Sequence, residues 1–352
     1  TGSQLKFGTV IITYGDRKEK IEKRSEEVQE EDLTNAIIKV GRSEAKKIYF
    51  VQGHGEKDPA DSEKSGYSEA RKALEGQGYV VETVNLAIEG KVPEDAKVLI
   101  IPGPTTEFFP QETQFIDDFL KKGNVGLYLL LDPHPAPSFE SFLKGWGIKP
   151  DNDLVLDVSG AGRLMGTGPS IPLVLNYENH KITDRFKAMT FFPLTRSIQQ
   201  AKEVPEGVTV EVLFRSNENS WGETDLRNQE ASFDPDRDLK GPLPLTVAAT
   251  RKVKPPSDKE PETKARIVVG GTSNYSINAY FPAQGNGNLF LNIVSWLAQD
   301  EDLISIRPKP ADDRRIVLSQ SQLATIRLLT LFVLPGVAFI AGIVVFVNRR
   351  RK

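Results

Sequence analysis

A run of 20 residues without a charge, at positions 328–347, constrains this sequence more than any other feature. It reads LLTLFVLPGVAFIAGIVVFV. A helix rises about 1.5 Å per residue, so the run covers roughly 30 Å, the thickness of a bilayer's hydrocarbon core. Pro335 and Gly336 lie inside it, and membrane helices tolerate such a pair at the cost of a local kink. The run predicts one transmembrane helix. The alternative, a buried core helix at the chain end, rarely lacks a polar face over this length.

Basic residues flank the run on both sides. Arg349, Arg350, Arg351 and Lys352 follow it directly, and the other flank carries three arginines, at positions 314, 315 and 327. Cytoplasmic flanks carry the excess of Lys and Arg, so the basic tail 348–352 is expected in the cytoplasm and the body outside. A body exported in this way needs an upstream signal or membrane helix. Because the chain starts at Thr1 without an apolar leader, we expect it to be a fragment of a longer precursor.

Composition excludes several kinds of site. The 352 residues include no cysteine, which removes disulfides, thiolate metal sites and cysteine nucleophiles together. The formal net charge is −3, so no overall basic field favours nucleic acid. The length suits two or three domains.

Apolar runs alternate with helical patterns along the first part of the body. Residues 47–51 (KIYFV) and 125–131 (VGLYLLL) are predicted strands, and residues 110–122 are a predicted amphipathic helix. Short apolar strands between helices predict an α/β fold with a parallel sheet covered on both faces.

The predicted domain organisation has seven parts. Residues 1–44 form a hairpin and helix connector, expected to be the remnant of an upstream domain, with the hairpin turn at Tyr14–Arg17. A helix is expected over residues 33–40, capped by Asp32, and the charged stretch 18–31 is expected to be a solvated connector. The remaining parts are an α/β domain (45–147), a β-rich insertion with loops (148–264), the completion of the α/β domain (265–302), a stalk (303–327), the transmembrane helix (328–347) and the basic tail (348–352).

Candidate site residues follow from the expected sheet, since ligands of open α/β sheets bind beyond the carboxyl ends of the strands. These ends carry His54, Glu56, Asp132, His134, Ser273 and Asn274. Two histidines and two carboxylates could hold a divalent metal. The same groups could bind a polar ligand such as a sugar. A third interpretation is structural: the residues cap strand ends and brace loops.

Two further residues need an interpretation. Trp221 lies in a polar stretch, where an aromatic side chain can stack on a sugar or dock a partner, or can fasten its loop to the body. His180 lies in the polar stretch 176–184 and is expected to be solvated.

Catalytic motifs are absent from the sequence. It contains no G-x-S-x-G, no H-E-x-x-H and no G-x-x-x-x-G-K-[ST]. The turn after residues 125–131 is Asp132-Pro133-His134, which is not a nucleophile elbow. We therefore predict no enzyme activity, no cofactor and no metal, and ATP hydrolysis would belong to a partner chain.

A set of motifs in a fixed order carries a family resemblance. They are residues 53–56 (GHGE), 131–133 (LDP), 219–224 (NSWGET), 241–245 (GPLPL), 271–278 (GTSNYSIN), 285–292 (GNGNLFLN) and 302–309 (DLISIRPK). Over roughly residues 45–347 the sequence resembles the gliding-motility-associated auxiliary family of ABC-type transport systems.

The resemblance implies a protein of the bacterial inner membrane with its body in the periplasm. It also implies a body with a class I glutamine-amidotransferase-like fold, and permease and ATPase partners on other chains. The expected function is a non-catalytic auxiliary subunit that handles substrate or assembles the complex. The alternatives are an extracytoplasmic module that binds a carbohydrate or small ligand around His54 and Asp132, and a metal-dependent hydrolase at the same place. The resemblance names no transported substrate.

Overall fold

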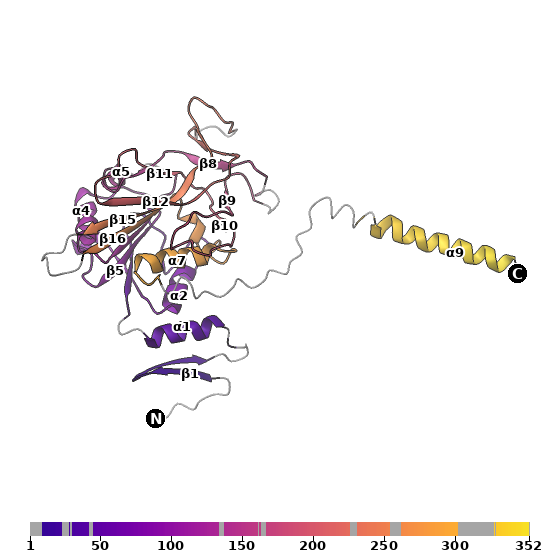
Figure 1. The fold of residues 1–352 in the computed structure, drawn as a ribbon, viewed down its shortest axis with the longest axis horizontal. Coiled ribbons are helices and arrows are strands. Elements are labelled where there is room, and N and C mark those ends of the chain that lie inside the picture. Colours follow the sequence, from indigo (N-terminus) through magenta and orange to yellow (C-terminus); the bar gives the residue numbers. More distant parts are fainter. Residues whose placement is uncertain are drawn as a thin grey trace. The chain divides into compact units, whose positions relative to one another are not determined.

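The computed structural model describes most of the chain, in two units that span Thr1–Pro310 and Ala311–Lys352. The described residues are 9–22, 28, 30–41, 45–133, 137–160, 162, 167–225, 231–253, 262–301, 327 and 329–351. His134 and nearly all of the expected stalk lie outside them. Figure 1 shows the order of the elements along the chain.

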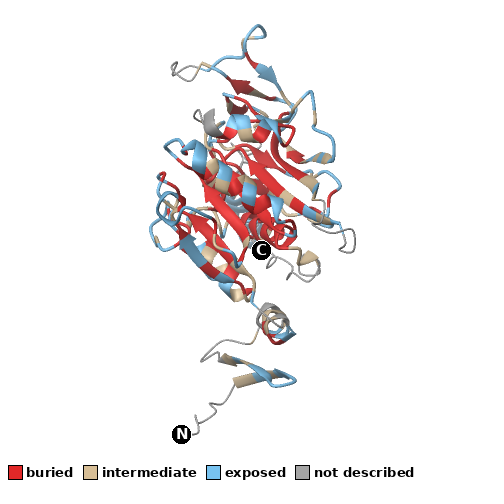
Figure 2. Cartoon of the chain, turned by 90° about the vertical axis from the view of Figure 1, so that its left-hand side faces the viewer, coloured by how far each residue is buried: buried red, intermediate tan, exposed pale blue. Residues whose placement is uncertain are grey.

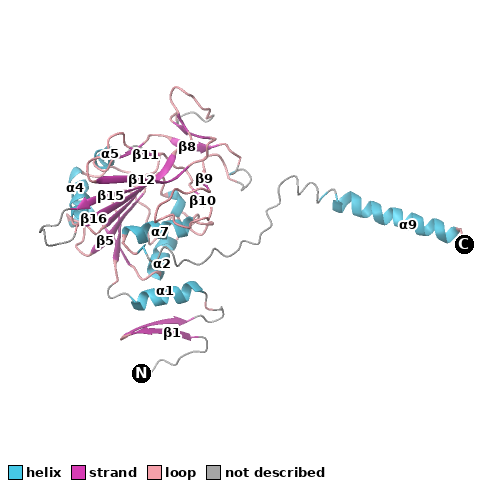
Figure 3. Cartoon of the chain, viewed as in Figure 1, coloured by secondary structure: helices cyan, strands magenta, loops and turns pink. Residues whose placement is uncertain are grey.

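A seven-stranded sheet forms the centre of the first unit (Figure 3), with the strand order β12-β15-β16-β6-β5-β3-β4. Strands β4, β3, β5, β6 and β16 run parallel, and β15 and β12 complete one edge in antiparallel pairing. Their bounds are β3 Lys47–Val51, β4 Val80–Val84, β5 Ala96–Pro102, β6 Gly126–Leu130, β12 Val208–Arg215, β15 Pro244–Val253 and β16 Thr263–Gly270. The predicted mixture of helices with a largely parallel sheet is confirmed.

Alternate side chains of each strand enter two separate cores. On β3, Ile48 and Phe50 pack on one face of the sheet, and Tyr49 and Val51 pack on the other. Helices α2 (Ser68–Gly76) and α7 (Asn286–Leu297) contribute to the first core. Helices α3 (Leu86–Glu89), α4 (Pro110–Lys121) and α5 (Pro137–Lys144) contribute to the second. Figure 2 shows buried residues concentrated in the strands between these layers. Burial on both faces explains why the strands read as continuous apolar runs.

The expected β-rich insertion contains two strands of the main sheet. Residues 244–249 of β15 are buried throughout, as in a central strand, and β15 pairs with both β12 and β16. The other strands of this range form small sheets. These are β14 (Leu239–Lys240) with β13 (Ser220–Glu223) and β8 (Leu154–Asp157), β11 (Ile198–Gln200) with β7 (Ile148–Pro150), and β10 (Thr190–Phe191) with β9 (Leu173–Val174).

The N-terminal elements differ in part from the prediction. The hairpin is confirmed, with β1 (Thr9–Tyr14) and β2 (Arg17–Glu22) joined by a two-residue turn in which Gly15 has φ +59°. However, residues 18–22 form β2 rather than a connector. Helix α1 (Glu30–Gly41) begins before Asp32, so Asp32 lies in its first turn and not at its cap. Strand β2 consists largely of charged residues, so an alternation of apolar residues could not reveal it in the sequence.

The second unit contains one apolar helix. Among the described residues it is the single helix long and apolar enough to cross a membrane, Leu329–Arg350, with 22 residues. A π-helical turn (η3, Leu329–Val333) leads into α9 (Leu334–Arg350). Pro335 lies where the π-helical turn passes into α9, inside this helix, and local π-helical adjustment is one way in which membrane helices tolerate a proline.

Candidate functional site

His54 lies between two carboxylates in the loop after β3. Its Nδ1 is 3.3 Å from Glu56 Oε1, and its Nε2 is 3.0 Å from Glu112 Oε2. Its backbone N–H donates to Glu56 Oε2 at 2.7 Å. The imidazole stacks on Phe108 with ring centroids 3.8 Å apart. All three polar side chains are buried, so this cluster is part of the interior.

The cluster fastens the loop after β3 to the start of α4. Glu112 also accepts the backbone N–H of Phe109 at 2.9 Å, which satisfies a free donor at the helix N-terminus. Burial raises the pKa of Glu56 above its ordinary value, although hydrogen bonds to its carboxylate oppose the rise. The described residues include no group of three or more His, Asp or Glu placed to hold a metal ion.

Asp132 belongs to a second cluster, after β6. Its Oδ1 accepts the backbone N–H of Ser273 at 2.6 Å, and its Oδ2 accepts the Ser273 hydroxyl at 2.9 Å. Tyr67 donates its hydroxyl to the Ser273 carbonyl at 2.6 Å. Gly103 has φ +67°, and a side chain there would press on Asp132 Oδ2, at 2.8 Å from its Cβ. Asn274 turns to Thr272 Oγ1, to which it donates from its backbone and its side chain.

The predicted site residues therefore form two clusters. Within the described part of the chain, no hydrogen bond or ion pair joins His54 to Asp132. His54 bonds with Glu56 and with Glu112, which the sequence did not single out, while Asp132 bonds with Ser273 as expected for neighbouring strand ends. These contacts support the structural interpretation, in which the polar groups brace loops.

His180 is buried, which corrects the expectation that it is solvated. Its ring contacts Trp296 edge to face, with centroids 5.0 Å apart, and its Nδ1 accepts the Ile182 N–H at 3.1 Å. Burial lowers the pKa of His180 to about 4, aided by the charge of Arg266. The partner ring comes from α7, far along the sequence, so a local polar pattern could not reveal it.

Trp221 lies on one face of the small sheet β14-β13-β8. In the pairing of β13 with β8, Trp221 stands opposite Leu156 and Glu223 stands opposite Leu154. Because alternate residues of a strand share a face, all four side chains lie on the same side. They form part of the wall of a hollow of about 580 Å³, here called the Trp221 hollow. Its other lining residues are Pro133, Val158, Pro169, Leu194, Asp225 and Ala231.

The Trp221 hollow is largely apolar but carries a carboxylate. Trp221 is half-buried and donates its indole N–H to Glu223 Oε2 at 3.2 Å. Val158 and Leu194 remain 53% and 49% exposed. Leu194 has φ +50°, a left-handed conformation that costs a bulky residue about 1–2 kcal/mol. Open apolar side chains on a strained backbone are typical of a binding surface rather than a core.

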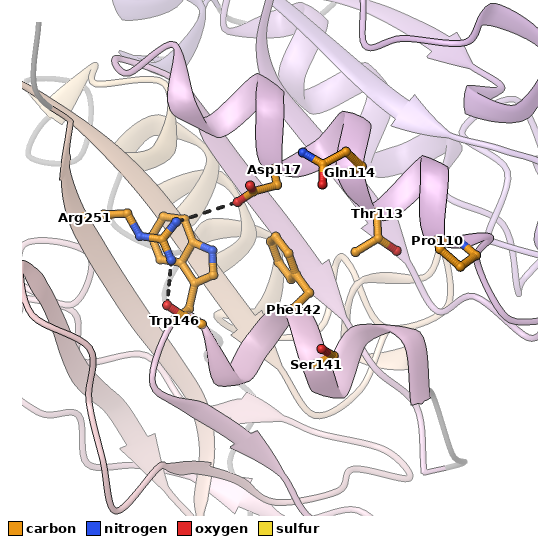
Figure 4. A pocket seen from close by; sticks show the side chains of 9 residues that line it. Pro110, Thr113, Gln114, Asp117, Ser141, Phe142, Trp146 and Arg251 are labelled. Atoms are coloured by element: carbon orange, nitrogen blue, oxygen red, sulfur yellow. Dashed lines mark hydrogen bonds and ion pairs between the residues drawn. The ribbon is translucent and has the colours of Figure 1, made fainter.

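A second hollow lies between α4 and α5 (Figure 4) and has a volume of about 510 Å³. Arg251 closes one end, with its guanidinium 3.9 Å from the centre of the Trp146 ring. It donates to the Gly145 carbonyl at 2.6 Å and lies 3.7 Å from Asp117. Since the charged groups of this hollow already contact one another, it offers less to a ligand than the Trp221 hollow.

Sequence reasoning found Trp221 but missed its neighbours Leu154, Leu156, Leu194 and Glu223. The period-two pattern of Leu154 with Leu156, and of Trp221 with Glu223, was available in the sequence. What was missing was the pairing of two strands more than 60 residues apart, which places both pairs on one face.

Comparison with known proteins identifies the family. The model of the family described as "ABC-type uncharacterized transport system", an auxiliary component, matches residues 45–293. The chain belongs to this family. The matched range contains the whole main sheet and the small sheet with the Trp221 hollow. Membership indicates an auxiliary component of a transport system, with permease and ATPase subunits as the expected partners.

Two solved structures show a weaker likeness to this family member. The mmIFT52 N-terminal domain is 16% identical with a TM-score of 0.49, covering 71% of this chain and 97% of that one. A ThuA-like protein from Bacteroides uniformis is 16% identical with a TM-score of 0.40, covering 72% and 91%. Likenesses this weak carry no argument about function. No curated protein matches the chain.

Proposed function

We propose that the chain is a non-catalytic auxiliary subunit of an ABC-type transporter in a bacterial inner membrane, of the gliding-motility-associated type. Helix α9 anchors it, the body lies on the extracytoplasmic side, and the tail lies in the cytoplasm. The body has a glutamine-amidotransferase-like fold and handles substrate or assembles the complex with a permease and an ATPase. The match to the family over residues 45–293 carries this proposal.

The apolar helix supports the anchoring. Leu331, Phe332 and Phe339 are largely exposed, and the helix is long and apolar enough to cross a membrane. Exposed apolar side chains all round a helix need lipid or a membrane partner to cover them. Arg349 and Arg350 end the helix and favour a cytoplasmic tail.

The Trp221 hollow supports a binding role for the body. Its volume of about 580 Å³ falls within the roughly 300–1,000 Å³ typical of ligand sites. It lies beside Pro133, at the carboxyl edge of the main sheet where α/β proteins bind ligands. In the proposed function this hollow, and not the braced residues around His54, contacts the substrate or a segment of the complex.

A module that binds a small ligand remains the second candidate function. The observation that favours it is the open, aromatic-lined hollow, because a carbohydrate or other small molecule can stack on Trp221. This moves the expected ligand away from Asp132, whose carboxylate oxygens both bond with Ser273, and away from His54, whose ring is enclosed by Glu56, Glu112 and Phe108.

Co-purification of the full chain from its own membrane tests the transporter assignment. Extraction in a mild detergent, capture through a tag on the body and mass spectrometry should recover a multispanning permease and an ATPase in fixed ratio. A control chain without residues 329–351 should recover neither. Capture of the anchored chain alone, under conditions that keep other transporters intact, would contradict the proposal.

A further inference from the structure

Glu223 is a buried carboxylate with no cationic partner among the described residues. The residue is 7% exposed, and its side chain accepts the Trp221 indole N–H and the backbone N–H of Asp225 at 3.0 Å. Among the described residues it forms no ion pair. An ionised carboxylate out of water is costly unless a positive charge compensates it, and two neutral donors compensate only in part.

Among the described residues, no neighbouring cation compensates the charge of Glu223. Asp225, also on the wall, lies 4.0 Å from Arg237, whose guanidinium is bound more closely by Asp234. Lys240 stands opposite Trp221 on β14, yet it is exposed and does not line the hollow. Within the part of the chain that the structure describes, the charged side chains that line the hollow are thus both carboxylates, those of Glu223 and Asp225.

The other lining residues of the hollow favour a ligand with an apolar group. Leu154, Leu156, Val158 and Leu194 line the same hollow as Glu223, and Trp221 adds an aromatic ring that also attracts cations. The strained backbone of Leu194 holds a half-exposed leucine on the wall of the hollow, where a glycine would avoid the strain.

We propose that the Trp221 hollow binds a ligand that joins a cationic group to an apolar group, such as an ammonium or guanidinium next to an aromatic or aliphatic chain. Glu223 is the anion that receives the charge, and Trp221, Leu156 and Leu194 cover the apolar part. This inference rests on the proposed function of the hollow. The source of the group is either a small organic amine or a Lys or Arg in an apolar segment of another subunit.

Three probes that share a phenylethyl group and differ in charge test the chemistry. The full chain in lipid nanodiscs is titrated with phenylethylammonium, with neutral 2-phenylethanol and with anionic phenylpropionate, against empty nanodiscs. Binding is followed by tryptophan fluorescence, because Trp146 and Trp296 are buried and Trp221 is the half-exposed one. The ammonium should bind saturably and about tenfold or more tightly than the alcohol, and the anion should bind most weakly. The signal should disappear in Trp221→Phe.

Two variants with matched controls separate charge from shape. Glu223→Gln should weaken the ammonium about tenfold and leave the alcohol unchanged, whereas Glu218→Gln removes an exposed charge nearby and should change neither. Leu194→Ser should weaken both probes, whereas Leu175→Ser, at a leucine that is also exposed but does not line the hollow, should weaken neither. The Leu194 variant removes an exposed side chain, so it keeps the test valid if Glu223→Gln fails to fold.

Peptides distinguish the two sources. An apolar peptide with one central lysine is compared with the same peptide carrying norleucine. Preference for the lysine peptide, for the small ammonium or for both supports the inference. Equal binding of charged and neutral probes, or no effect of Glu223→Gln on the ammonium, overturns it. Failure of this binding test with intact co-purification would leave the transporter assignment standing.

Discussion

The strand ends of the main sheet and the open face of the small sheet use polar residues in opposite ways. At the strand ends, Asp132 and Ser273 satisfy each other, and His54 is enclosed by two glutamates and Phe108. On the small sheet, Glu223 faces an open apolar hollow without a cationic partner among the described residues. The comparison teaches that residue type at a strand end is a weak indicator of function. Whether the side chain is enclosed by protein or lines an open hollow is a stronger one.

The largest expected effect is on stability, at Glu112. Glu112→Ala removes the acceptor of the Phe109 N–H and the partner of His54, so buried donors lose their bonds. We expect a loss of about 2–4 kcal/mol in the free energy of unfolding, measured by urea denaturation in detergent. The control Glu94→Ala, at a side chain that is 80% exposed, should cost less than about 0.5 kcal/mol. A small effect of Glu112→Ala would mean that the cluster is not a brace.

The pH dependence of the free energy of unfolding tests a second buried group, His180. Its pKa in the folded chain is about 4, against an ordinary 6.5. Between about pH 4 and pH 6.5 the folded state therefore binds fewer protons than the unfolded state. The contribution of neutral His180 to the free energy of unfolding is therefore complete above pH 6.5 and is lost as the pH falls through 4, in total about 3 kcal/mol. His180→Asn keeps an acceptor for the Ile182 N–H and should remove this part of the pH dependence. An unchanged curve would show that His180 is solvated after all.

A substitution at Asp132 tests directly whether the strand ends stabilise the fold or bind the ligand. Asp132→Asn replaces one carboxylate oxygen with an NH₂ that cannot accept from Ser273, and we expect a cost of about 1–2 kcal/mol in unfolding free energy. The affinity for phenylethylammonium should not change. If the affinity falls while the stability holds, the strand ends belong to the binding site and the distinction drawn above is wrong.

The smallest expected change in stability is at Leu194. Leu194→Gly relieves left-handed strain but loses a half-exposed leucine, so the free energy of unfolding should change by less than about 1 kcal/mol. Binding of both the ammonium and the alcohol should weaken, since the wall of the hollow is lost. Unchanged binding would remove Leu194 from the site.

Local patterns predicted the central strands and helices well. Residues 47–51 form β3 as expected, and α4 begins at Pro110 as expected, because apolar periodicity and proline act within a few residues. The membership of β15 in the main sheet, the burial of His180 under Trp296 and the pairing of β13 with β8 all depend on contacts distant in sequence. The candidate site was predicted only in part for the same reason: Trp221 was visible, and the face it shares with Leu156 and Glu223 was not.

The orientation of the chain in its membrane is the most direct test of the account. The sequence has no cysteine, so a single one can be introduced as a label, either as Glu94→Cys on the exposed surface of the body or as an added residue after Lys352. Spheroplasts are treated with a maleimide that cannot cross membranes, before and after permeabilisation. We predict that the cysteine at position 94 is labelled in intact spheroplasts and the tail cysteine only after permeabilisation. Labelling of the tail in intact spheroplasts, or protection of position 94, would contradict a membrane-anchored subunit whose body acts outside the cytoplasm.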